Sequence, residues 1–167
     1  MLALFPADLL FYAILVAMDA IDRKILAELQ ANGRISLTEL AERVQLTVSP
    51  CHRRLRELER AGVVVGYRAS LDPAAVDLGF ETLVFVTMRE ATRETIAAFE
   101  DAVSAVPHIV DAQRLFGEPD YLLRVVAASL TDFQRIYDEQ LSTLPGAFRL
   151  TTTLVMRRVV DNRPLPL

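Results

Sequence analysis

Residues 47–62 read TVSPCHRRLRELERAG and gather four arginines and one histidine in a chain whose formal net charge is −4. Thr47 suits an N-cap, and Pro50 is compatible with a helix because first-turn amides have no intrahelical partner to lose. At 3.6 residues per turn, one side of this helix is an apolar stripe. The stripe consists of Cys51, Leu55 and Leu58, Arg54 flanks it, and the outer side carries Ser49, His52, Arg53, Arg56 and Arg60. The stretch therefore predicts an amphipathic helix with a positively charged outer face.

Two shorter helices are predicted before this stretch. The first begins at Asp19, whose side chain suits an N-cap, and ends at residues 32–33, which read Asn-Gly. The second begins at Ser36, which forms a capping-box pattern with Glu39, and ends near Val44. Three helices with a tight turn before the last form a helix-turn-helix module. Such a module places its final helix in the DNA major groove, with the N-terminal residues nearest the base edges.

Net charge alone does not decide whether this helix binds DNA. Residues 19–66 contain eight Lys or Arg and seven Asp or Glu, so the net charge of the module is only about +1. The arginines could form a solvated face with i,i+4 pairs, such as Arg53 with Glu57. The placement of the acids favours DNA binding instead, because three of them lie at helix N-termini, where the helix dipole favours negative charge. Since arginine suits bidentate contacts with guanine and phosphate, we expect the outer face to contact DNA.

After residue 66 the pattern changes to β-branched runs that alternate with helical periodicity. Strands are predicted at 63–71, 82–89, 109–116, 121–128 and 148–160, and helices at 95–106 and 131–144. Residues 80–160 thus have the order βαββαβ of a ferredoxin-like domain, whose antiparallel sheet has helices on one face and is open on the other. We expect an α+β protein in which a winged or helix-turn-helix three-helix domain precedes this domain.

The expected boundaries divide the chain into five segments. They are an apolar extension at 1–17, the helix-turn-helix domain at 18–62, a linker strand at 63–79, the ferredoxin-like domain at 80–161 and a tail at 162–167. The uninterrupted apolar run at 9–18 has ten residues, whereas about 20 are needed to span a bilayer. No Lys or Arg precedes the run, which argues against an export signal. The plainer alternatives are an apolar helix that packs on a partner, or a start of translation at Met18.

The sequence contains no candidate catalytic or metal site. One cysteine and two histidines are too few for a structural zinc site, and a single cysteine excludes an internal disulfide, as expected for a cytoplasmic protein. Cys51 and His52 are adjacent, so a helix turns them about 100° apart and they do not form a nucleophile and base pair. No glycine-rich phosphate loop is present. We expect no enzymatic activity, no cofactor and no attachment to a membrane.

The segment Gly117-Glu118-Pro119-Asp120 joins two of the predicted strands. A plain hairpin turn explains its composition completely. It is also suited to be a binding loop, because its carboxylates and backbone amides, close to the threonines at 151–153, can receive the ammonium and carboxylate of an amino acid. The residues by themselves favour the turn and leave the binding loop open.

Several stretches together resemble one family. The run from DAIDRKIL at 19–26 to RASLDP at 68–73, followed by FGEPDYLL at 116–123, LPG at 144–146 and TTTLVM at 151–156, resembles the Lrp/AsnC (feast/famine) family of transcriptional regulators. The resemblance is collinear over about residues 18–161. It implies an N-terminal DNA-binding domain and a C-terminal effector domain that forms homodimers through its sheet. Such dimers commonly associate into tetramers or octamers, and small molecules, usually amino acids, bind between dimers.

The resemblance also implies roles for individual residues. It places Thr47, Ser49, Pro50, Arg53, Arg54 and Arg56 in the recognition helix, Gly117, Asp120 and Tyr121 in a glycine-acid-tyrosine effector loop, and Thr152 at a polar position of the last strand. It thereby favours the binding loop over the plain turn. Two features depart from the family pattern: residues 1–17 have no counterpart, and Glu118-Pro119 makes this loop stiffer and more acidic than in many members.

The sequence therefore predicts a DNA-binding transcriptional regulator whose activity or assembly responds to a small effector, expected to be an amino acid. The predicted DNA contacts are Thr47, Ser49, Pro50, His52, Arg53, Arg54 and Arg56, and the predicted effector contacts are Gly117, Glu118, Pro119, Asp120, Tyr121, Thr151, Thr152 and Thr153. The expected partners are double-stranded DNA, the effector and further copies of the chain. The alternative is a small-molecule-binding ferredoxin-like protein, with or without enzymatic activity, whose helical module serves protein contacts only.

Overall fold

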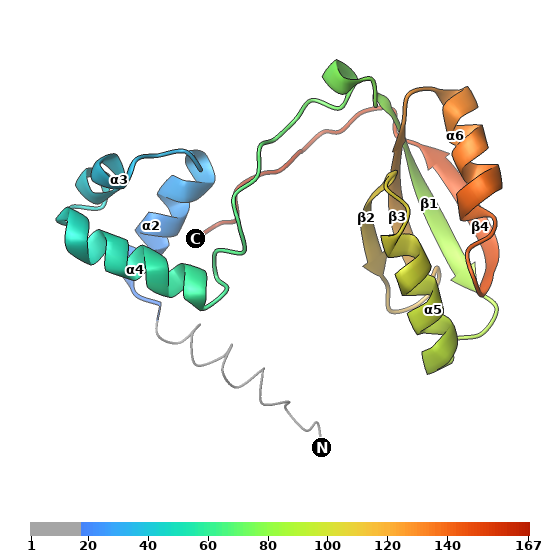
Figure 1. The fold of residues 1–167 in the computed structure, drawn as a ribbon, viewed down its shortest axis with the longest axis horizontal. Helices are drawn as coiled ribbons and strands as arrows, with labels where there is room; N and C mark the ends of the chain where they lie inside the picture. The colour runs from blue at the N-terminus through green and yellow to red at the C-terminus, as the bar shows by residue number, and fades with distance from the viewer. Residues whose placement is uncertain (1–17) are drawn as a thin grey trace. The chain divides into compact units, whose positions relative to one another are not determined.

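The computed structural model describes residues 18–167, which form two compact units. The helical unit contains the described residues up to Ala69 together with Val160–Leu167, and the sheet unit contains Ser70–Val159. Figure 1 colours the chain from blue at the N-terminus to red at the C-terminus. No helix in this described part is long and apolar enough to cross a membrane. The expectations for residues 1–17 lie outside the described residues.

Three helices build the helical unit: α2 (Ala20–Ala31), α3 (Leu37–Arg43) and α4 (Val48–Arg60). The Asp19 side chain accepts hydrogen bonds from first-turn amides of α2, and the Asp22 carboxylate accepts one from the Asp19 amide, so α2 begins with a complete capping box. Ser36 Oγ accepts a hydrogen bond from the Glu39 amide at the start of α3. The Glu39 carboxylate does not return the predicted bond to Ser36 but lies 2.7 Å from the guanidinium of Arg43.

The core of the helical unit is apolar and draws on all three helices. It consists of Ile25, Leu26, Leu40, Ala41, Val44, Cys51 and Leu58. Cys51 and Leu58 confirm the predicted stripe of α4, and Leu55 packs partly buried against the same core. Gln45, with a φ of 61°, turns the chain between α3 and α4. Because the stripe faces this core, the opposite side of α4 faces solvent.

The sheet unit has the predicted βαββαβ order, which confirms the ferredoxin-like fold and the α+β class. Its elements are β1 (Phe80–Met88), α5 (Arg93–Ser104), β2 (Ile109–Arg114), β3 (Tyr121–Ala127), α6 (Leu130–Ile136) and β4 (Ala147–Leu154). The strands form one antiparallel sheet in the order β2-β3-β1-β4. Helix α6 continues directly into a π-helical turn, η2 (Tyr137–Leu141).

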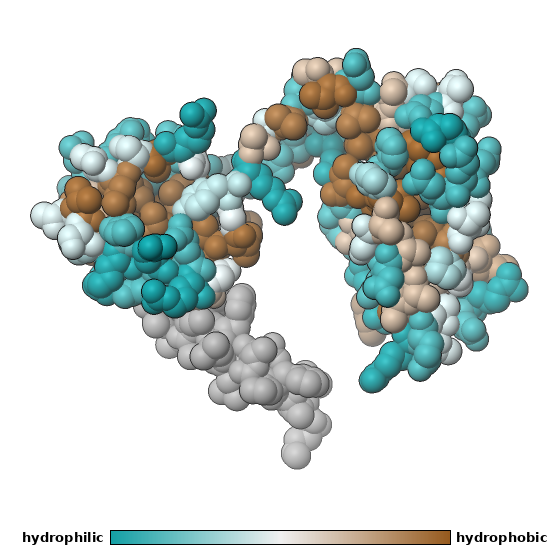
Figure 2. Space-filling model, viewed as in Figure 1, coloured by the Kyte–Doolittle hydropathy of each residue, from teal (hydrophilic) through white to brown (hydrophobic). Residues whose placement is uncertain are grey.

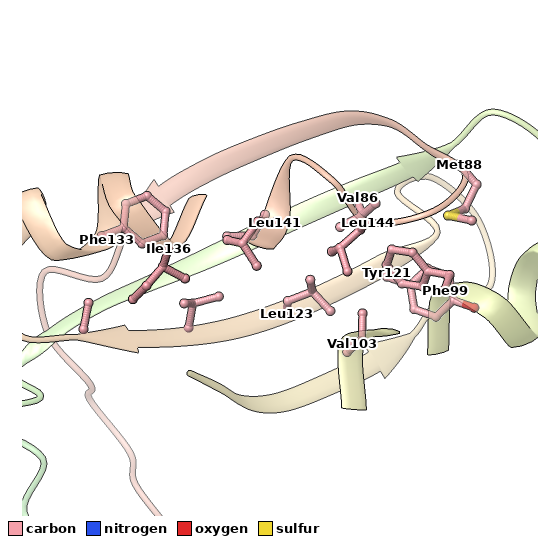
Figure 3. Packing of buried hydrophobic residues seen from close by; sticks show 13 residues of the cluster. Val86, Met88, Phe99, Val103, Tyr121, Leu123, Phe133, Ile136, Leu141 and Leu144 are labelled. Atoms are coloured by element: carbon pink, nitrogen blue, oxygen red, sulfur yellow. The ribbon is translucent and has the colours of Figure 1, made fainter. Parts of the chain in front are cut away.

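Side chains of β1 alternate between the two faces of the sheet. Val86 and Met88 are buried on the face that packs against the helices, and Figure 3 shows them in one core with Phe99 of α5 and Ile136 of α6. The alternate residues of β1 are only half-buried; they include Leu83, Phe85 and Thr87. We call the face that carries these half-buried residues the open face.

Two predicted strands differ from those observed. Residues 63–79 contain no strand but a 3-10 turn, η1 (Ala74–Val76), and the last strand ends at Leu154 instead of near residue 160. A strand needs a neighbour to take its backbone hydrogen bonds. Within residues 18–167, no strand pairs with 63–79 or with the residues beyond 155. Strand propensity alone therefore overestimated the sheet at these two places.

Candidate nucleic-acid interface and effector pocket

The outer face of α4 carries most of the side chains predicted to contact DNA. Ser49, His52, Arg53 and Arg56 are all exposed, whereas Pro50 in the first turn is half-buried. Figure 2 shows hydrophilic residues gathered over this helix. The structure thus brings guanidinium, imidazole and hydroxyl groups together on one surface. These groups hydrogen-bond both to base edges and to phosphates in a DNA groove.

The N-terminal end of α4 has no side-chain cap. Thr47 occupies the N-cap position, but its side chain makes no capping hydrogen bond, which differs from the cap predicted there. The first amides of a helix have no intrahelical partner, and the helix dipole adds a positive potential at this end. The exposed Thr47 hydroxyl and this helix end therefore suit a phosphate oxygen.

Arg53 and Arg56 differ in their present partners. Arg53 Nη1 lies 2.9 Å from Glu57 Oε1 one turn along the helix, which is the pair expected of a solvated face. The two side chains are 64% and 52% exposed, so their pairing contributes little in water. Arg56 is exposed and enters none of the ion pairs found within residues 18–167. A DNA phosphate or base can therefore reach Arg56 directly but has to replace Glu57 at Arg53.

Arg54 does not share the outer face. Its Nη1 atom lies 2.8 Å from both Asp19 Oδ2 and Asp22 Oδ1, and its side chain is 24% exposed. The hydrogen bond to Asp22 raises the pKa of Arg54. The Asp22 amide chiefly, and then Arg54, lower the pKa of Asp19. Arg54 thus ties α4 to the start of α2, a role that sequence spacing did not reveal because Asp22 lies 32 positions away.

The loop between β2 and β3 is anchored by Asp120. Asp120 Oδ2 accepts a hydrogen bond of 2.7 Å from the Met88 amide, and the Asp120 amide donates one of 2.9 Å to the Val86 carbonyl. Gly117 adopts a φ of 128°, a conformation that favours glycine. Asp120, predicted as an effector contact, therefore holds its own loop against the end of β1.

Tyr121, also predicted as an effector contact, lies on the side of the sheet that the helices cover. Its ring packs in the core with its centroid 4.5 Å from that of Phe99, as Figure 3 shows. Its hydroxyl donates a hydrogen bond of 2.8 Å to Glu100 Oε1. Burial, followed by the bond to Glu100, raises the pKa of Tyr121 to about 12. Tyr121 also lines a separate cavity of about 290 Å³ beside α5, together with Arg114.

The remaining loop residues line a pocket on the open face. Its lining consists of Phe85, Thr87, Glu118, Pro119, Arg149 and Thr151 around about 300 Å³, and we call it the loop pocket. Three of the predicted effector contacts thus meet there. Thr153 lies opposite Leu83, further along the open face, while Thr152 lies opposite Val84 and points to the helix-covered face.

Sequence reasoning missed three residues of the loop pocket, namely Phe85, Thr87 and the charged Arg149. Arg149 lies opposite Thr87 in the register of β4 and two positions before Thr151, so both side chains point to the open face. This two-residue period was a usable signal once β4 was predicted. Glu118 and Arg149 give the loop pocket one negative and one positive group. Within the described residues, no cluster of His, Cys, Asp or Glu is arranged to hold a metal ion.

An exposed cationic helix on a helix-turn-helix scaffold is typical of DNA-binding proteins. A ferredoxin-like unit with a small charged pocket is suited to bind a small ligand. The fold is thus that of the class of DNA-binding regulators that carry a ligand-binding domain. Residues 18–65 match the family model for winged helix-turn-helix DNA-binding, and residues 81–165 match that for the Lrp/AsnC ligand binding domain. The chain belongs to the Lrp/AsnC family of transcriptional regulators.

The similarity to known proteins is consistent with membership of the Lrp/AsnC family. The chain is 41% identical over 148 residues to the leucine-responsive regulatory protein of Rhizobium meliloti (strain 1021), covering 87% of this chain and 94% of that protein. It is 35% identical over 150 residues to the DNA-binding transcriptional activator DecR of Escherichia coli (strain K12), covering 90% and 99%. A transcriptional regulator from Neisseria meningitidis, solved as a complex with L-Met, has a TM-score of 0.85 at 35% identity over 90% of this chain and 97% of that one.

These relatives are transcriptional regulators, and the two matched models together span nearly all of residues 18–165. The chain is therefore a DNA-binding transcriptional regulator with an effector-binding domain, and it is not an enzyme. The alternative, in which the helical module serves protein contacts only, is wrong.

Proposed function

We propose that an α-amino acid is the effector of this regulator and that it binds in the loop pocket. One observation carries the proposal: Glu118 and Arg149 place opposite charges around a space of about 300 Å³. The ammonium group of the ligand pairs with Glu118, the carboxylate pairs with Arg149 and the Thr151 hydroxyl, and the ligand side chain packs on Phe85. The complex of the Neisseria meningitidis relative with L-Met supports this choice of ligand class.

The other predicted effector residues shape the pocket in this proposal. Gly117 supplies the backbone conformation of the loop, and Asp120 fixes the loop to Met88 at the end of β1. Tyr121 anchors the same loop from the core side through Phe99 and Glu100. Because the loop is held from both sides, Glu118 is presented to a ligand at little cost in loop ordering.

For DNA we propose that α4 enters the major groove. Ser49, His52, Arg53 and Arg56 reach base edges and phosphates, while Thr47 and the helix N-terminus take a phosphate. Arg54 holds α4 on α2, where Asp19 and Asp22 engage it. We also propose that the regulator acts in the cytoplasm, where its DNA target would be reached.

We also propose that the chain assembles into homodimers through the open face. Leu83 and Phe85 of β1 and Leu122 of β3 are half-buried on the open face, and a second copy that packs there forms a homodimer. Two α4 helices on successive turns of DNA multiply the affinity of a module whose own charge is small. Dimers associate further into tetramers or octamers. An amino acid that binds one assembly better than another shifts the population by that difference, typically about 1–3 kcal/mol.

The test is a calorimetric titration of the full chain with a panel of L-amino acids that includes L-Met and L-Leu. We expect at least one to bind, and Glu118→Gln and Arg149→Gln each to weaken it about tenfold or more, because each removes a charge-assisted hydrogen bond. The control is Arg93→Gln, an exposed arginine on α5. Unchanged binding in both variants would place the effector elsewhere, and no binding by any member of the panel would rule out the ligand class.

A further inference from the structure

The helical unit holds the C-terminal end of the chain in an apolar groove. The groove lies between α2 and residues 63–67, and about 310 Å³ of space remains open beside the tail. Met18, Leu26, Leu29 and Tyr67 line it together with Leu165 and Leu167 of the tail. We call it the tail groove. It shares no residue with the outer face of α4 or with the loop pocket.

Gln30, in the last turn of α2, binds the tail through both ends of its amide. Gln30 Nε2 donates a hydrogen bond of 3.2 Å to the Leu165 carbonyl, and the Leu165 amide donates one of 2.6 Å to Gln30 Oε1. The Gln30 side chain thus forms hydrogen bonds with both backbone polar groups of Leu165, which lies 135 positions away in the sequence. This pairing reproduces a rung of a strand ladder and fixes which tail residue lies in the groove.

The composition of the tail makes this pairing selective. Residues 164–167 read Pro-Leu-Pro-Leu, and proline has no backbone N–H. Leu165, between the two prolines, therefore has the one backbone donor within residues 164–166. Prolines also hold the segment extended before it binds, which lowers the ordering cost, and aromatic side chains such as Tyr67 are usual in grooves that accept proline-rich segments.

The docking is shallow. Leu165 remains 71% exposed and Leu167 49% exposed. Hydrogen bonds between exposed groups contribute little net stability, because water competes for the same donors and acceptors. The tail is thus bound weakly enough to be released without unfolding the helical unit.

The residues just before the tail are anchored in the sheet unit. The Val155 amide donates a hydrogen bond of 3.0 Å to the Glu81 carbonyl, and Arg158 forms an ion pair with the Glu81 carboxylate. The chain therefore passes between its two units twice, once after Ala69 and once before Val160. The second connection exists only while residues 164–167 occupy the tail groove.

We propose that the tail groove is a recognition site for the chain's own Pro164-Leu165-Pro166-Leu167 segment, and that this latch raises DNA affinity by restricting the freedom of the helical unit. A module held by two connections samples fewer arrangements than one held by a single linker. It therefore loses less conformational entropy when it binds DNA. Release of the latch lowers DNA affinity without changing any side chain of α4.

Gln30→Ala and Leu165→Ser test the latch in the full chain. We expect faster amide deuterium exchange in the C-terminal peptide, an unchanged helical circular dichroism spectrum and DNA affinity reduced about threefold or more by fluorescence anisotropy. The matched control is Gln134→Ala, an exposed helical glutamine on α6, which should change none of these. Unchanged exchange in both variants would overturn the docking, and faster exchange with unchanged affinity would overturn its link to DNA.

A cysteine pair distinguishes the chain's own tail from that of a second copy. In the double variant Gln30→Cys and Leu165→Cys, oxidation should give a cross-link within one chain on a non-reducing gel and should restore the DNA affinity that the reduced form lacks. A covalent dimer, or no cross-link at all, would overturn the proposal. Neither readout involves an amino-acid effector, so failure here is separate from failure of the loop pocket.

Discussion

Arg54 and Arg56 stand two positions apart on α4, and yet they have different surroundings. Arg54 is held by Asp19 and Asp22, whereas Arg56 is exposed on the outer face. The helical wheel separates the two residues by angle, but it contains no information about a carboxylate on another helix. The pairing of Arg54 with Asp19 and Asp22 follows only from the packing of α4 against α2.

Arg54→Ala should lower the free energy of unfolding of the helical unit by about 1–2 kcal/mol, because the variant leaves the Asp22 carboxylate partly buried without its partner. Arg56→Ala should leave stability within about 0.5 kcal/mol. It should instead weaken DNA binding and reduce the slope of log affinity against log salt by up to about 1. Urea denaturation and fluorescence anisotropy measure the two effects. The same outcome for both variants would show that the two arginines are not distinguished in this way.

Tyr121 gives the sheet unit a dependence on alkaline pH. Its pKa is raised from 10.0 to about 12, so the unfolded chain loses the phenol proton first. The stabilisation is therefore complete below about pH 10 and is lost as the pH rises from about 10 to 12, a loss of about 3 kcal/mol over the whole range. Urea unfolding between pH 8 and pH 11 should show this decline in the wild type. The decline should be smaller in Tyr121→Phe, and an equal decline in both would assign it to other groups.

At the scale of elements, helices were predictable and strand ends were not. Side chains within a few residues decide a helix start, and Asp19 and Ser36 cap the helices that they were predicted to cap. Strands depend on neighbours, which is why 63–79 is not a strand in the single chain. The same dependence affects the site. The two-residue period places Arg149 on the same face as Thr151, but which face of the sheet that is, and which face Tyr121 points to, follows from the register of β4 and β3 against β1.

The turn before β4 strongly favours glycine at position 146. Gly146 has a φ of 74°, and an added Cβ would overlap Thr95 Cγ2 and lie 2.9 Å from Met88 Cε. Gly146→Ala should therefore destabilise the sheet unit by about 2–3 kcal/mol, the sum of backbone strain and overpacking. Gly62 has a φ of 72°, and an added Cβ would meet nothing within 4 Å. In Gly62→Ala the cost is therefore the backbone strain alone. Its cost to the helical unit should be about 1 kcal/mol. Thermal denaturation measures the cost of Gly146→Ala and of Gly62→Ala. Equal costs would show that the steric overlap at Gly146 adds nothing to the backbone strain.

At the scale of the whole molecule, the proposed homodimer depends on the open face. Leu83 is half-buried there and lies outside the loop pocket. Leu83→Asp should reduce the mass measured by light scattering to that of the 18.6 kDa chain and lower DNA affinity at least tenfold, because charge at an apolar interface is costly and a single module binds weakly. Thr131→Asp, exposed on α6, is the control. A variant that keeps the wild-type mass would place the interface elsewhere.

In the proposed DNA-binding mode, we expect the exposed pair of Arg53 and Glu57 to influence how fast such a regulator finds its operator. A chromosome offers about 10⁶–10⁹ competing sites, and a protein held strongly by bulk phosphates spends its time on the wrong ones. In the proposed binding mode, DNA that does not fit α4 meets the negative charge of Glu57 beside Arg53, so we expect its residence there to be short. A fitting base edge replaces the carboxylate with a better-oriented acceptor. We therefore expect the carboxylate beside the arginine to shorten each unproductive encounter and to hasten the search.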